Sequence, residues 1–138
     1  MSKFFHFFGV LFCLINQAYA SDKEDIFARA SASYNASDFA TTIELINPLA
    51  ENGHAASQEL LGIMYFYGEG VEESRENKQK ALEYLIKAAE QGLPEAQGFV
   101  GEIYYMGYDI VKPDRDKAFK WLSMAAKKMT CIRRFILV

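Results

Sequence analysis

Hydrophobic residues recur along most of this chain at spacings of three and four, which is typical of amphipathic helices. Leu61 and Tyr65 share one helical face, and Ala81, Leu85 and Ala88 share another further along the chain. Turns that contain glycine separate these segments. The pattern predicts helices that pair as hairpins over residues 54–92 and again over residues 93–128.

The two predicted hairpins carry the same residues at corresponding positions. Partners lie 39 residues apart as far as Val71 and 37 residues apart from Asn77 onward, so the difference in length falls in a loop, where it costs little. A repeat of this length indicates a repeat architecture. The first copy contains Gly53, Leu61-Gly62, Tyr65, Gly68-Glu69-Gly70-Val71, Lys80-Ala81, Tyr84-Leu85 and Ala88-Ala89, and the second contains Gly92, Val100-Gly101, Tyr104, Gly107-Tyr108-Asp109-Ile110, Lys117-Ala118, Trp121-Leu122 and Ala125-Ala126.

The small residues in this pattern have specific expected roles. Gly62 allows the second helix of the hairpin to approach the first closely. Gly68 and Gly70 are expected to end the first helix and to adopt positive φ in the turn. Asn77 and Asp114 are expected to N-cap the second helix of each hairpin.

The repeated motif resembles the Sel-1-like repeat, a variant of the tetratricopeptide-like hairpin. The resemblance rests on Leu61-Gly62-x-x-Tyr65-x-x-Gly68-x-Gly70-Val71 and on the Lys80 to Gly92 segment, and the second copy departs from it at Asp109 and Met129. It implies an all-α fold, an α/α solenoid in which successive hairpins build a right-handed superhelix.

The first 20 residues have the features of a secretory signal peptide. Lys3 is followed by an apolar run from Phe4 to Ile15, and Ala18-Tyr19-Ala20 fits a cleavage site after Ala20. We therefore expect a periplasmic or secreted protein, with an uncleaved N-terminal anchor as the alternative.

Residues 21–53 resemble a degenerate tetratricopeptide-like hairpin, in which Pro48 predicts a kink or break near Ile46-Asn47. Residues 129–138 form a divergent or truncated C-terminal tail, since Phe135 to Val138 is wholly apolar where a solenoid needs a polar end. Cys131 is the single cysteine that remains after cleavage, and it is either free or paired between chains.

The composition and the missing motifs exclude several classes of function. A net charge of −3 argues against a nucleic-acid partner, which needs a basic face. His54 is the single histidine of the mature chain and is expected to be a solvent-exposed turn residue, so the sequence offers no nucleophile with its base. Metal-ligand and phosphate-binding motifs are also missing. We therefore predict no catalytic residues, no metal and no cofactor, and hence no enzyme.

The resemblance to Sel-1-like repeats implies a concave groove lined by the first helix of each hairpin. Aromatic and methionine side chains beside carboxylates suit a protein or peptide partner, possibly a basic one. The positions expected to face this groove are Glu59, Ile63, Phe66 and Tyr67 in the first repeat, Gly98, Glu102, Tyr105 and Met106 in the second, and, less securely, Phe27, Ser31 and Tyr34 in the degenerate hairpin.

The function implied is that of an exported adaptor or scaffold for protein–protein interactions. Two alternatives stay open. One is an envelope enzyme or small-ligand binder, because some cysteine-rich exported relatives bind or slowly hydrolyse β-lactams, although this chain lacks their cysteines. The other is a truncated fragment of a longer repeat array.

Overall fold

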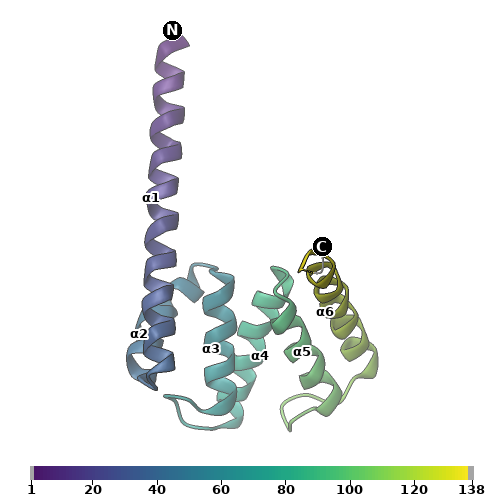
Figure 1. The fold of residues 1–138 in the computed structure, drawn as a ribbon. Coiled ribbons are helices and arrows are strands. Elements are labelled where there is room, and N and C mark those ends of the chain that lie inside the picture. Colours follow the sequence, from purple (N-terminus) through teal and green to yellow (C-terminus); the bar gives the residue numbers. More distant parts are fainter. Residues whose placement is uncertain (1, 137–138) are drawn as a thin grey trace. The chain divides into compact units, whose positions relative to one another are not determined.

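The computed structural model describes the backbone of residues 2–136 and the side chains of residues 17–129. This part of the chain is all-α, as predicted, and contains no strand (Figure 1). It divides into two compact units, Met1–Leu45 and Ile46–Val138, which we describe separately. The helices are α1 (Ser2–Asn35), α2 (Phe39–Glu51), α3 (Ala55–Tyr67), α4 (Arg75–Glu90), α5 (Pro94–Met106) and α6 (Arg115–Ile136).

The first unit is a hairpin made of α1 and the start of α2. The Tyr34 and Phe39 rings pack at the turn with their centroids 5.7 Å apart. Asp38 accepts a hydrogen bond from the backbone N–H of Thr41 at 3.2 Å, and the hydrogen bonds from Thr41 lower the pKa of its carboxyl. The predicted signal segment forms the first part of α1. Among the residues that the structure describes, no helix has both the length and the hydropathy needed to cross a membrane.

A kink or break was predicted near Ile46-Asn47. Helix α2 continues through Pro48, so the break is wrong. Proline removes one backbone hydrogen bond from a helix interior. Ile46, Leu49 and Ala50 are all buried around this position. Their burial favours the helical conformation of the last turn of α2, which opposes the effect of the missing hydrogen bond.

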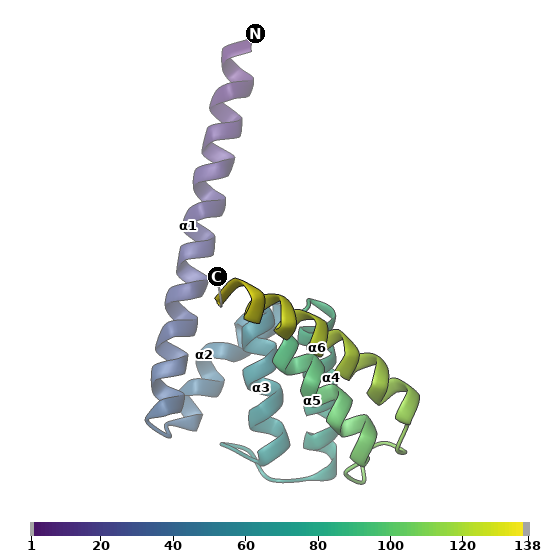
Figure 2. The ribbon, with the colours of Figure 1, turned by 45° about the vertical axis from the view of Figure 1, so that its right-hand side comes forward.

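In the second unit, α3 pairs with α4 and α5 with α6, and α4 packs against α5 between the two hairpins (Figure 2). Gly62 lies where α3 and α4 approach each other closely, because a Cβ there would lie only 2.7 Å from Leu85 Cγ. Gly101 plays the same part against Leu122 in the second hairpin, also at 2.7 Å. The core between the helices is built from Leu85, Ala88, Ala89, Ala96, Val100 and Ile103, together with other buried residues.

Two buried glutamines connect successive hairpins through backbone hydrogen bonds. Gln58 Nε2 donates to the carbonyl of Ala50, and Gln97 Nε2 donates to the carbonyl of Ala89, both at 3.0 Å. The two glutamines are 39 residues apart, which is the repeat length. Each therefore binds the C-terminal end of the preceding helix in the same way, an interaction that the hydrophobic pattern did not reveal.

The loops inside the hairpins confirm most of the expected turn chemistry. Gly68 and Gly70 both adopt positive φ, and Asp109, which replaces the second glycine, also does so at 59°. Asp114 caps α6 by accepting a hydrogen bond from the N–H of Lys117 at 3.0 Å. Asn77 is not a cap, however. Ser74 caps α4, because its Oγ accepts a hydrogen bond from the N–H of Asn77 at 3.1 Å.

The last helix runs on through much of the predicted tail, since α6 ends at Ile136. Several large apolar side chains of α6 are exposed beside charged ones. Phe119, Leu122 and Met129 are all exposed there, with Phe119 exposed to 74%. The side chains of Cys131 and of the apolar Phe135–Val138 end lie outside the described residues.

Candidate partner-binding surface

Three of the predicted groove residues are large and exposed on the first helices of the two repeats. Tyr67 lies at the end of α3 and is 60% exposed, while Tyr105 and Met106 lie at the end of α5 and are 54% and 56% exposed. Tyrosine and methionine are enriched in protein–protein interfaces. Their exposure in both repeats marks this surface as a candidate for binding.

Phe66 is buried, so the prediction that it lines an open groove is wrong. It is only 6% exposed and packs edge-on against three rings, those of Tyr67, Phe99 and Tyr108, with centroids 4.9 to 5.2 Å away. The reason is the neighbouring hairpin, which places Phe99 and Tyr108 over it. Phe66 supports the surface from beneath.

Phe99 and Tyr108 complete the surface, although the sequence pattern did not single them out. The ring of Tyr67 stacks against that of Phe99 with centroids 6.0 Å apart. Because Phe99 is three residues before Glu102 on α5, helical spacing could have placed it on the same face. Tyr108 lies in a loop, where no periodicity indicates its direction. We call Tyr67, Phe99, Glu102, Tyr105, Met106 and Tyr108 the aromatic surface.

Glu102 is the exposed carboxylate of this surface. It accepts a hydrogen bond from the hydroxyl of Tyr108 at 2.5 Å, and this bond is the main reason that the pKa of Tyr108 is raised. The hydrogen bond fixes the Tyr108 ring relative to α5. One face of the buried Phe66 ring is also close to a cation, with Lys78 Nζ 5.8 Å from its centroid.

Glu59 and Ile63 are less accessible than predicted. Ile63 is partly buried against the core. Glu59 is half-buried near the start of α5, where its Oε1 has no hydrogen-bond partner among the described residues. Burial, and then repulsion from Glu95, raise the pKa of Glu59, while a backbone hydrogen bond from Ala96 lowers it. Glu59 is therefore a junction residue between α3 and α5 rather than an open binding group.

The remaining predicted positions are Gly98, Phe27, Ser31 and Tyr34. Gly98 lies on α5 with open space beside it, since a Cβ there would meet no atom within 4 Å. Phe27, Ser31 and Tyr34 lie in the first unit, where Ser31 Oγ donates to the carbonyl of Phe27 at 2.9 Å.

His54 is a helix cap and is half-buried, which differs from the exposed turn residue that was predicted. Its Nδ1 accepts a hydrogen bond from the N–H of Ser57 and lies 2.8 Å from Ser57 Oγ. Ser57 is fully buried, and its contact with His54 stabilises the start of α3. No cluster of potential metal ligands occurs among the described residues.

Comparison with known protein families identifies the repeat. The model of the Sel1 repeat matches residues 55–93 and 94–128. The chain belongs to the Sel1 repeat family. Sel1 repeats are scaffold folds rather than enzyme folds, and they generally mediate protein–protein interactions.

Two solved Sel1-repeat structures are similar to this chain. A Sel1 repeat protein from Oxalobacter formigenes is 30% identical, with a TM-score of 0.65, and the match covers 74% of this chain and 40% of that protein. A protective antigen with an SLR fold, present in uropathogenic Escherichia coli strains, is 27% identical, with a TM-score of 0.71, and the match covers 83% of this chain and 25% of the antigen. The predicted α/α solenoid is confirmed, and this chain spans less than half the length of either protein.

Proposed function

We propose that this protein is an adaptor that binds a protein or peptide partner through the aromatic surface. The observation that carries the proposal is the exposure of Tyr67, Tyr105 and Met106 on the first helices of the two repeats. Exposed aromatic and methionine residues are enriched where proteins bind one another. The general role of Sel1 repeats in protein interactions supports the same conclusion.

The geometry of the surface favours a partner that carries an apolar side chain next to a basic one. Tyr67 is held between Phe99 and Phe66, so binding costs little side-chain entropy there. The Glu102 carboxylate lies on the same face of α5 as Tyr105 and Met106. A lysine or arginine of the partner could pair with Glu102 while its neighbour covers the exposed rings. Binding should therefore weaken as salt is added.

Selection from a displayed peptide library tests the proposal, because it identifies the peptide sequences that the surface binds. We expect the folded chain to enrich peptides that combine apolar and basic residues. Tyr67→Ser together with Tyr105→Ser should weaken binding of the enriched peptides by roughly tenfold or more, because truncation of a central aromatic contact typically costs about 2 kcal/mol.

Phe119→Ser provides the matched control. Phe119 is also a large exposed aromatic residue, but it lies on α6 and outside the aromatic surface. The control should bind the selected peptides as tightly as the unchanged protein. If Phe119→Ser abolishes binding and the tyrosine double variant does not, the partner binds at α6 and the assignment of the surface is refuted.

We also propose that the protein is exported and that cleavage follows Ala20. Lys3, the apolar run after it and Ala18-Tyr19-Ala20 support this proposal. Expression of the full chain in a Gram-negative host, followed by cell fractionation and intact-mass measurement, provides the test. The expected product begins at Ser21 and is found in the periplasm or the medium. A full-length product in the membrane fraction would identify an uncleaved anchor, and one in the cytoplasm would refute export.

A further inference from the structure

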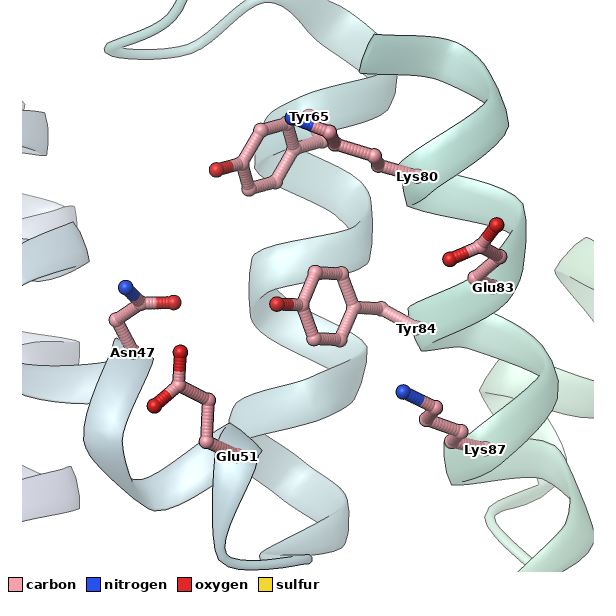
Figure 3. Close-up of a pocket in the computed structure, with 7 residues that line it drawn as sticks. All are labelled: Asn47, Glu51, Tyr65, Lys80, Glu83, Tyr84 and Lys87. Atoms are coloured by element: carbon pink, nitrogen blue, oxygen red, sulfur yellow. The ribbon is translucent and has the colours of Figure 1, made fainter. Parts of the chain in front are cut away.

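We propose that a polar hollow between α2, α3 and α4 binds a small zwitterion, such as an amino acid or a dipeptide that carries both a free amine and a free carboxylate. The hollow has a volume of about 320 Å³. This is near the lower end of the range of small-molecule sites. Its lining consists of Asn47, Glu51, Tyr65, Lys80, Glu83, Tyr84 and Lys87 (Figure 3).

Two tyrosines form the aromatic part of the hollow. The rings of Tyr65 and Tyr84 are inclined by only 24°, with centroids 6.1 Å apart. Both hydroxyls point toward Asn47 and Glu51 on α2 (Figure 3). Burial is the main cause of the raised pKa of Tyr84, and Tyr65, Glu51 and Glu83 raise it further. Tyr84 therefore remains a neutral phenol, which can both donate and accept hydrogen bonds.

The charged groups around the hollow are not paired with one another. Within the described part of the chain, none of the seven lining residues forms an ion pair or a side-chain hydrogen bond. Glu83 and Lys87 have the spacing that favours an ion pair on a helix, yet Lys87 Nζ instead lies 5.4 Å from the centroid of the Tyr84 ring. These polar groups are therefore available to a ligand.

The second repeat provides an internal comparison for this hollow. Tyr65, Lys80 and Glu51 have equivalents of the same residue type, whereas the other four lining positions change. Asn47, Glu83, Tyr84 and Lys87 correspond to Ile86, Lys120, Trp121 and Met124. The repeat framework alone does not require the polar set, because the second hairpin forms the same fold without it. The polar lining is therefore specific to the first hairpin and is not part of the shared repeat motif.

The distribution of charge indicates the class of ligand. Two carboxylates and two ammonium groups line the hollow, so either an anion or a cation alone would meet a like charge. A zwitterion can satisfy both signs. Its amine would lie toward Glu51, assisted by Asn47 and the two phenols, and its carboxylate toward Lys87 (Figure 3). This site is independent of the aromatic surface, because Tyr65 and Tyr67 are two residues apart and point to opposite sides of α3.

Titration of the isotope-labelled full chain with glycylglycine, followed by NMR chemical shifts, tests this proposal. We expect saturable shifts that are confined to the lining residues, with a Kd of about 1 mM, as an open polar site allows. N-acetylglycylglycine lacks the free amine and glycylglycinamide lacks the carboxylate. Each should bind roughly fivefold or more weakly, because each loses one charge-assisted contact. Equal binding of either blocked dipeptide would overturn the zwitterion assignment.

Variants locate the binding site. Lys87→Met introduces the residue that the second repeat has at this position, and Glu51→Gln removes the opposite charge while keeping the side-chain shape. Each should weaken glycylglycine binding by roughly fivefold, with an unchanged helical spectrum. Lys117→Met, at the position equivalent to Lys80 in the second repeat, should leave binding unchanged. Shifts that do not saturate, or an equal loss in Lys117→Met, would refute the site.

Discussion

The substitution Gly62→Ala tests the packing that defines the first hairpin. An added Cβ would lie 2.7 Å from Leu85 Cγ and 3.1 Å from the carbonyl oxygen of Ala81. Leu85 is 0% exposed, so its side chain has no solvent space into which it can rotate. Either α3 and α4 must separate, or Leu85 must leave its preferred rotamer. Overpacking of this kind costs about 1–3 kcal/mol.

Gly98→Ala is the matched control, because it makes the same chemical change on another first helix. A Cβ at Gly98 would meet no atom within 4 Å. Alanine is favoured over glycine inside a helix by about 0.5–1 kcal/mol. We therefore expect Gly98→Ala to raise the free energy of unfolding by that amount. Gly62→Ala has the same gain in helix propensity, so its net effect is a loss of up to about 2.5 kcal/mol.

Urea unfolding followed by circular dichroism measures both effects, provided that the slope of the free energy of unfolding against urea concentration is the same for all variants. Gly101→Ala should have a smaller effect than Gly62→Ala. Its Cβ would meet Leu122 Cγ at 2.7 Å, but Leu122 is 43% exposed and can move toward solvent. A Gly62→Ala protein as stable as Gly98→Ala would refute the close approach of α3 and α4.

Two further substitutions test the electrostatics and the capping. Burial and repulsion from Glu95 raise the pKa of Glu59 in the folded protein, so folding favours the protonated carboxyl. The stability that this carboxyl contributes when protonated is lost as pH rises through the folded pKa. The free energy of unfolding of Glu59→Gln should therefore exceed that of the unchanged protein at about pH 7. This difference should shrink toward about pH 5, and a difference that grows on acidification would contradict the prediction. Ser74→Ala should lower the free energy of unfolding by about 1 kcal/mol, measured by thermal unfolding, whereas Asn77→Ala should cost less because Ser74 holds the cap.

The repeat pattern was sufficient to predict the fold of the second unit. Gly62 and Gly101 recur at the repeat length, and each proves to be a point of helix contact. Such contacts are visible in the sequence because the close approach of two helices excludes larger side chains. The positive φ values of Gly68 and Gly70 were predictable for a similar reason, since few other residues adopt them readily.

The burial of individual aromatic residues was not predictable in the same way. Phe66 and Tyr67 are neighbours on the last turn of α3, and both were expected to face the groove. Phe99 and the loop residue Tyr108 decide between them, because they cover Phe66 and leave the outer part of Tyr67 in solvent. Contacts from another hairpin therefore determine which of two adjacent rings is available to a partner, and local spacing has no information about them.

Capping and helix continuity also depended on competing interactions. Asn77 is a good capping residue, but Ser74 lies three residues earlier and takes that role, while the Asn77 side chain donates to the carbonyl of Glu72 at 2.7 Å. Proline normally interrupts a helix, yet α2 continues through Pro48. In both places the sequence offered two compatible local structures, and the packing of neighbouring residues selected one.

The two repeats differ mainly at positions whose side chains do not pack between the two helices of a hairpin. The second helices pack through the same small and apolar residue types in both copies, so these positions describe the fold and contain little information about function. The outward positions are free to diverge, because changes there cost little stability. Loss of the polar lining in the second repeat leaves the hairpin intact, as Ile86 and Trp121 pack against the same core. Differences between repeats, rather than their shared motif, therefore indicate where to search for a ligand.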